Sequence, residues 1–111
     1  MMQTYRVEIT KYAQKQIKDI ARYVKVELKN PGAAKRLLFD LKKSILSLEN
    51  MPHRIPLTDE DVWRGENIHK MAVRNYLVYF WIDEIKNVVY ITAVVYSKRE
   101  QKRQLSEMEM Q

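Results

Sequence analysis

The stretch KVELKNPGAAKRLL (Lys25–Leu38) decides the fold because it separates two long segments that both have helical periodicity. The proline at position 31 disfavours the α conformation of Asn30, so the first helix must end at about this point. The second helix is expected to begin near Gly32. A turn this short predicts that the two helices lie antiparallel and side by side, as a helical hairpin.

Two stripes run along the first predicted helix, residues 11–29. The apolar stripe consists of Ala13, Ile17, Ile20, Val24 and Leu28. The second stripe, called the cationic stripe below, consists of Lys11, Lys15, Lys18, Arg22, Lys25 and Lys29. At 100° per residue the two stripes lie roughly 140° apart around the helix axis. Only Asp19 and Glu27 are nearby carboxylates, so the stripe is either a solvated face or a surface for an anionic partner.

The second predicted helix runs from Gly32 to about Asn50 and is also amphipathic. Its apolar positions are Ala34, Leu37, Leu38, Leu41, Ile45 and Leu48. Because both helices have an apolar face to bury, the hairpin must pack against a third element. Strand patterns on both sides of the hairpin indicate that this element is a sheet.

The strand patterns lie before and after the hairpin. TYRVEIT (Thr4–Thr10) alternates apolar and polar residues, which predicts a half-buried strand, and Thr10 stands where the first helix needs an N-cap. Three further strands are predicted at residues 68–73, 76–82 and 88–96, with a tight turn at Arg74 and Asn75 between the first two. The last two strands are apolar on both faces, as expected of central strands.

Together these elements predict an α+β fold in the order β-α-α-β-β-β, with the antiparallel helical hairpin packed on one face of a mainly antiparallel sheet. The length fits one domain over residues 1–111, and we expect residues 106–111 to be frayed. No segment is apolar enough to span a membrane, and we recognise no signal peptide, so we expect a cytoplasmic protein. The chain has no cysteine and no histidine pair with metal-ligand spacing, so we expect neither a metal nor a cofactor.

Metal-free phosphodiester cleavage is the enzyme chemistry that the composition still permits. That reaction needs a base, an acid and cations around the phosphate. The candidate groups are Glu66, His69, Lys70, Arg74, Tyr96, Lys98 and Arg99. Lys70 and Arg99 could face one concave surface, or Lys70 could point outward from an edge strand while Arg99 is solvated. The long connection before these strands, residues 51–67, is acidic at Asp59, Glu60 and Asp61, and its length suggests a function.

Basic residues outnumber acidic ones by 20 to 14, and the resulting net charge of +6 favours nucleic acid or an acidic protein as partner. Four cations follow the last predicted strand, in the segment VVYSKREQKRQL (Val94–Leu105): Lys98, Arg99, Lys102 and Arg103. These four residues, called the tail cations below, are candidates for contact with a target. Solubility is the plainer explanation for the same charges.

The order and spacing of several segments resemble the ParE/RelE superfamily of bacterial toxins from type II toxin–antitoxin modules, and most closely its ParE-type members, also described as plasmid stabilisation proteins. The segments are YRVEIT, AQKQIKDIARYV, NPGAAKRLLFDLKKSILSLENMP, IHKMAVRNYLVYFWID and VVYITAVVYSKREQ. They cover about residues 4–103. The resemblance implies the fold derived above and a cognate, acidic, partly disordered ParD-like antitoxin that wraps around the toxin.

The RelE-type members of this superfamily cut mRNA in the ribosomal A site, and their active-site pattern is only partly present. Lys70 falls where the RNases have a strand lysine, and Arg99 falls on the arginine after their last strand. Ile68 replaces a second lysine, Leu77 replaces an arginine, and Leu105 lies near the place of a terminal tyrosine. Losing several such groups makes efficient cleavage improbable.

The resemblance therefore favours a ParE-type inhibitor that poisons DNA gyrase and has no catalysis of its own, with the tail cations facing the target. The alternative is a ribosome-dependent mRNA interferase, a metal-independent endoribonuclease that uses Lys70, Arg74 and Arg99. A third possibility is a degenerate, non-toxic member that retains antitoxin binding or DNA autoregulation.

Overall fold

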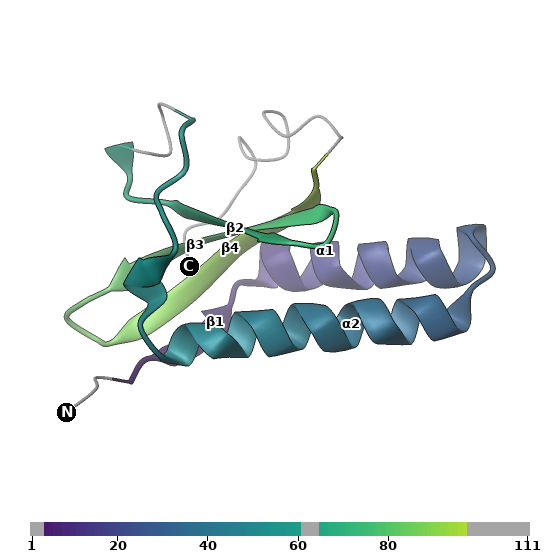
Figure 1. Ribbon diagram of the computed structural model, residues 1–111, viewed down its shortest axis with the longest axis horizontal. Helices are drawn as coiled ribbons and strands as arrows, with labels where there is room; N and C mark the ends of the chain where they lie inside the picture. The colour runs from purple at the N-terminus through teal and green to yellow at the C-terminus, as the bar shows by residue number, and fades with distance from the viewer. Residues whose placement is uncertain (1–3, 61–64, 98–111) are drawn as a thin grey trace.

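A computed structural model describes residues 4–60 and 65–97 of the chain. In these residues a helical hairpin packs along one face of a four-stranded sheet, which confirms the predicted α+β architecture (Figure 1). The elements, in chain order, are β1 (Arg6–Ile9), α1 (Lys11–Arg22), a π-helical segment (Tyr23–Glu27), α2 (Pro31–Leu46), β2 (His69–Val73), β3 (Tyr76–Asp83) and β4 (Val88–Tyr96).

Thr10 joins β1 to α1 as predicted. Its side-chain oxygen accepts a hydrogen bond from the backbone N–H of Ala13 at 3.2 Å, which satisfies one of the free donors in the first helical turn. Its own backbone N–H donates to the carbonyl of Ile91 on β4 at 3.0 Å. The start of α1 is therefore fixed to the centre of the sheet.

The first helix differs from the prediction in its last turn. Regular α geometry ends at Arg22, and Tyr23–Glu27 is a π-helical segment in which the N–H of Leu28 bonds to the carbonyl of Tyr23 at 3.2 Å. This wider turn rotates the following residues relative to an α-helix. Leu28, which we expected on the apolar stripe, is consequently 56% exposed.

The turn between the helices follows the NPG sequence. Lys29 adopts a left-handed conformation (φ 51°), which ends the first helix. The Asn30 side chain accepts from the N–H of Ala33 at 3.0 Å, and Pro31 occupies the first turn of α2, so this helix begins one residue earlier than expected. A short 3-10 turn, Ser47–Glu49, extends α2 to nearly the predicted end.

The sheet has the strand order β1-β4-β3-β2. The β2–β3 and β3–β4 pairs are antiparallel, whereas β1 runs parallel to β4. The helical hairpin carries the chain from β1 at one edge of the sheet to β2 at the other edge. The sheet is thus mainly antiparallel, as predicted. β4 lies between β1 and β3 and is buried from Val88 to Val95, which confirms its prediction as a central strand.

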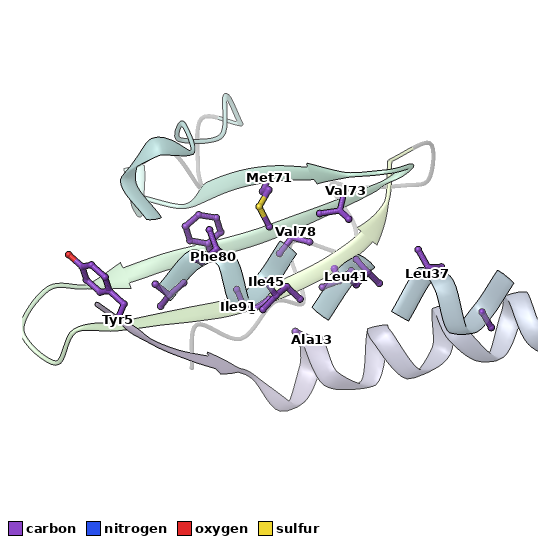
Figure 2. Packing of buried hydrophobic residues seen from close by; sticks show 14 of the residues in the cluster. Tyr5, Ala13, Leu37, Leu41, Ile45, Met71, Val73, Val78, Phe80 and Ile91 are labelled. Carbon is purple, nitrogen blue, oxygen red and sulfur yellow. The ribbon is translucent and has the colours of Figure 1, made fainter. Parts of the chain in front are cut away.

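The main core lies between α2 and the sheet. Figure 2 shows Leu41 and Ile45 of α2 directed toward Val78, Phe80 and Ile91 on the strands. The opposite face of the sheet carries its own smaller apolar cluster, formed by Ile68, Tyr79, Ala93 and Val95, with Tyr12, Leu77 and Trp81 packed against it. The strands are therefore apolar on both faces although the hairpin covers one face.

A β-bulge shapes this second face. Tyr79 pairs with Ala93 and Phe80 pairs with Ile91, which leaves Thr92 without a partner residue in the ladder. The bulge shifts Ala93 and Val95 onto the face away from the hairpin, where the pleat would otherwise have turned them toward it. Among the described helices, none is long and apolar enough to cross a membrane.

Candidate functional site

Lys70, the first candidate for phosphate contact, lies on β2 at the edge of the sheet. It pairs in register with Tyr79, so its side chain stands on the face away from the hairpin. Its ammonium nitrogen lies 3.1 Å from Asp59 Oδ1 and 3.8 Å from Glu60 Oε1, both in the acidic connection, and 28% of its side chain is exposed. Lys70 is therefore neither free nor simply solvated, because carboxylates of the same chain neutralise it.

Tyr79 lies beneath this ion-pair cluster and is fully buried. Its hydroxyl oxygen and Glu60 Oε2 are both buried, and within the described residues neither makes a hydrogen bond of normal geometry. Burial, followed by the charges of Glu60 and Asp59, raises the pKa of Tyr79 well above its usual value. The phenol thus keeps its proton at physiological pH and can act only as a neutral hydrogen-bonding group.

His69 precedes Lys70 in β2 but points to the opposite face. Its ring stacks on Phe80 with centroids 5.0 Å apart, and Nδ1 lies 2.7 Å from the carbonyl oxygen of Ile55. Because a carbonyl only accepts, Nδ1 carries the proton and donates it. Burial lowers the pKa of His69, although the bond to Ile55 opposes this shift. His69 therefore supports the core and shares no site with Lys70.

Arg74 lies in the turn between β2 and β3. Its Nε donates to Asp40 Oδ2 of α2 at 2.6 Å, and Nη2 contacts the same oxygen. This pair fastens the second helix to the turn between β2 and β3. The other predicted groups are scattered too: Glu66 is exposed before β2, and Tyr96 ends β4 beside Tyr76. The tail cations, and with them Arg99, lie outside the described residues.

An open groove of about 780 Å³ separates α1 from the far end of β3 and β4. This groove was not predicted from the sequence. Its helical wall includes Tyr12, Lys15, Gln16, Asp19 and Tyr23, and its strand wall includes Asn75, Tyr76, Val95 and Tyr96. Tyr76 and Tyr96 pack edge to face, with ring centroids 5.5 Å apart. The signal that could have found the groove is the pair Tyr12 and Tyr23, which lie between the apolar and the cationic stripe of the first helix.

Gln16 holds the wall of this groove in place. Its side-chain oxygen accepts from the backbone N–H of Val94 at 2.8 Å, at the edge of β4 just past the end of its pairing with β1. The helix thus takes the place of a neighbouring strand there. Tyrosine rings, an amide, a carboxylate and a lysine around an open groove can bind a ligand, but they include no nucleophile activated by a base. Among the described residues, no group of three or more His, Asp or Glu could hold a metal ion.

Comparison with known proteins identifies the family. The family model described as the ParE toxin of the type II toxin–antitoxin system parDE matches residues 7–101. The chain belongs to this ParE toxin family. It is a type II toxin–antitoxin toxin of the ParE/RelE superfamily, as the resemblance in its sequence predicted. A comparison with curated protein sequences found no match.

Solved structures share the fold at low sequence identity. The chromosomal ParDE toxin–antitoxin system from Pseudomonas aeruginosa matches with a TM-score of 0.71 and 12% identity, over 86% of this chain and 99% of the other. The RelBE2 toxin–antitoxin complex from Mycobacterium tuberculosis matches with a TM-score of 0.63 and 16% identity, over 84% of this chain and 98% of the other. A mutant of Escherichia coli RelE in the free state, with two arginines replaced by alanine, matches with a TM-score of 0.57 and 19% identity. The match covers 94% of this chain and 93% of the other. These likenesses show the fold and do not separate gyrase inhibition from RNA cleavage.

Proposed function

We propose that this ParE-family toxin is a poison of DNA gyrase that acts by binding, in the cytoplasm, and is neutralised by a cognate acidic, ParD-like antitoxin. The observation that supports binding over cleavage is the separation of Lys70 from Arg74. Lys70 is neutralised by Asp59 and Glu60, and Arg74 is held by Asp40. Two of the three candidate RNase cations are thereby bound to carboxylates of this chain, one in the connection before β2 and the other on α2.

The tail cations are the part of the chain that we propose contacts the target. They are Lys98, Arg99, Lys102 and Arg103, a cluster of four positive charges within six positions. Such a cluster suits an acidic protein surface or DNA at the enzyme's cleavage site.

The proposed antitoxin partner has support from the solved neighbours, because the Pseudomonas aeruginosa and Mycobacterium tuberculosis structures are described as toxin–antitoxin systems. In this chain the groove beside α1 offers an aromatic wall with Lys15 at its rim. An amphipathic acidic segment that folds on binding would place apolar side chains against the tyrosines and carboxylates near the lysine.

A gyrase assay with the purified full chain tests the proposal. We expect accumulation of cleaved plasmid and loss of supercoiling, both reversed by the protein that the neighbouring gene encodes. Lys98→Gln/Arg99→Gln/Lys102→Gln/Arg103→Gln should lose most of the inhibition, whereas the exposed Lys86→Gln on the β3–β4 turn should retain it. An absence of any effect on cleavage or supercoiling by micromolar protein would exclude gyrase poisoning.

A ribosome-dependent mRNA interferase remains the second candidate function because Lys70, at the position of a family strand lysine, pairs with Tyr79 on the sheet face away from the hairpin. Primer extension on mRNA in a translating extract would reveal A-site cuts. Arg99→Ala should then reduce cutting more than ribosome binding. Asp59→Asn/Glu60→Gln, which frees Lys70, should increase cutting. If overexpression is harmless while antitoxin binding is tight, the chain is instead the degenerate, non-toxic member.

A further inference from the structure

The net positive charge of this protein comes from one segment of the chain. Residues 11–50, which form the helical hairpin, contain ten Lys and Arg but four Asp and Glu, so they carry the entire net charge of +6. The rest of the chain holds ten residues of each sign and is neutral. Charge that served solubility alone would have no reason to collect on a single supersecondary unit.

Within the hairpin, the cationic stripe lies in the open. All six of its residues are exposed, and within residues 4–60 and 65–97 none makes an ion pair. The four residues in the regular part of α1, Lys11 to Arg22, extend over about 16 Å and lie within about 60° of one another around the axis. Lys25 and Lys29 follow in and after the π-helical segment. The fold thus maintains a row of like charges that repel one another.

No carboxylate of the described residues forms an ion pair with the stripe, although Asp19 and Glu27 lie nearby in the sequence. Asp19 lines the groove on the flank of α1, and Asp40 is bound to Arg74. Glutamate and lysine placed four residues apart would have stabilised an exposed helix, yet none of the stripe residues has such a contact in the described structure. An unneutralised row of cations is suited to an anion that arrives from outside.

We infer that the cationic stripe of α1 binds the sugar–phosphate backbone of duplex DNA, independently of base sequence. Duplex DNA is a straight rod with one negative charge per about 1.7 Å, and each contact with a lysine or arginine releases a condensed counterion. Lysine dominates the stripe and acts on phosphate as a point charge, whereas base recognition relies on bidentate side chains.

The same residues argue against an acidic protein as the occupant. A peptide that folds on binding needs apolar anchors, and the sector of α1 from Lys11 to Arg22 that carries the stripe has none. The aromatic residues of α1 that could serve as anchors, such as Tyr12, line the groove on its flank. The B-form duplex is favoured over duplex RNA because its wide major groove admits a helix, while that of A-form RNA is too narrow.

Fluorescence anisotropy with the full chain and a labelled mixed-sequence DNA duplex tests this inference between about 50 and about 200 mM salt. With about five phosphate contacts, the logarithm of the binding constant should fall with the logarithm of salt concentration at a slope of about −4.5. Lys11→Gln/Lys15→Gln/Lys18→Gln/Arg22→Gln removes four contacts, so it should reduce the steepness of this slope by about 3.6 and weaken binding at least tenfold at the lowest salt. Circular dichroism and thermal unfolding of this variant would show that the exposed substitutions leave the fold intact.

The matched control removes four charges elsewhere. Lys98→Gln/Arg99→Gln/Lys102→Gln/Arg103→Gln changes the net charge equally but leaves the stripe intact, so it should retain most of the slope. Equal losses in both variants would show that net charge alone drives binding, and would overturn the inference. Three other results would overturn the inference: no binding of DNA at low salt, binding of polyglutamate as tight as that of DNA, or binding of duplex RNA tighter than that of DNA. Gyrase is absent from this binding assay. A failure of the DNA-binding inference is therefore a separate result from a failure of the proposed gyrase function.

Discussion

At the scale of single residues, ion pairs and burial decide what the candidate side chains can do. Lys70 has the position expected of a phosphate-binding lysine, but Asp59 and Glu60 contact it. His69 is adjacent in sequence, yet it is stacked in the core on Phe80. The residue type alone indicated a catalytic role for both, and the surroundings assign them to structural contacts.

Tyr79 should tolerate loss of its hydroxyl. Because this buried oxygen lacks a normal hydrogen bond, Tyr79→Phe should raise the free energy of unfolding by about 1 kcal/mol. The matched control is Tyr5, whose hydroxyl donates to Glu84 Oε2 at 3.0 Å. Tyr5→Phe should lower the free energy of unfolding by about 1 kcal/mol. Urea denaturation measures both, and a clear loss of stability in Tyr79→Phe would mean that its hydroxyl has a partner.

His69 should make stability depend on pH in the acidic range. Burial lowers its folded-state pKa below the unfolded value of about 6.5, so the unfolded chain binds the proton more readily. The stability that His69 contributes by staying neutral in the folded state is fully present above about pH 6.5. It is lost as the pH falls toward the folded-state pKa. Urea midpoints of the wild type should therefore decrease below about pH 6.5, and His69→Gln should remove part of this decrease. An unchanged pH profile in the variant would rule out His69 as its source.

At the scale of elements, junctions control where the helices begin and end. Thr10 starts α1, the π-helical segment Tyr23–Glu27 ends it, and Asn30 with Pro31 starts α2. The π-helical segment exposes Tyr23, Val26 and Leu28 at the end of the hairpin. A periodicity argument that assumed 3.6 residues per turn could not foresee this.

The N-cap of α1 should be measurable by substitution. Thr10→Ala removes the oxygen that accepts from the Ala13 N–H, so we expect the free energy of unfolding to fall by about 1 kcal/mol. Thr10→Ser keeps the hydroxyl and should lose less than half as much. Chemical denaturation compares the two variants, and equal losses would indicate that packing of the threonine methyl group, and not the cap, determines the effect.

At the scale of the whole molecule, the two layers depend on residues of α2 that reach the sheet. Leu41 is fully buried against the strands, whereas Leu46 on the same helix is 55% exposed. Leu41→Ala should lower the free energy of unfolding by about 3 kcal/mol, because it leaves a cavity between hairpin and sheet. Leu46→Ala should lower the free energy of unfolding by less than about 0.5 kcal/mol. Similar costs for both would contradict the packing described here.

Charge is also organised at the scale of the whole molecule. The hairpin carries all of the net charge, and the groove with its tyrosines lies along one flank of α1. The cationic stripe lies on the exposed face of α1 and the groove adjoins it, with Lys15 shared between them. A toxin that must bind both an antitoxin and a target can use two adjoining surfaces of this kind. The DNA-binding and gyrase assays measure the contributions of the stripe and of the tail cations independently.

The sequence by itself determined the elements, their order and the resemblance to the ParE/RelE superfamily. Apolar periodicity located both helices and all four strands, and Thr10 marked the start of α1. These features depend on residues a few positions apart, so a local pattern contains the information.

Only the tertiary structure decided which side chains meet. Lys70 and Asp59 are 11 positions apart, Arg74 and Asp40 are 34 apart, and the Gln16–Val94 contact joins residues 78 apart. The parallel pairing of β1 with β4, the bulge at Thr92 and the groove beside α1 are likewise products of chain packing. Local periodicity fixes which face of an element is apolar, but the partner on that face is chosen by three-dimensional packing among distant segments.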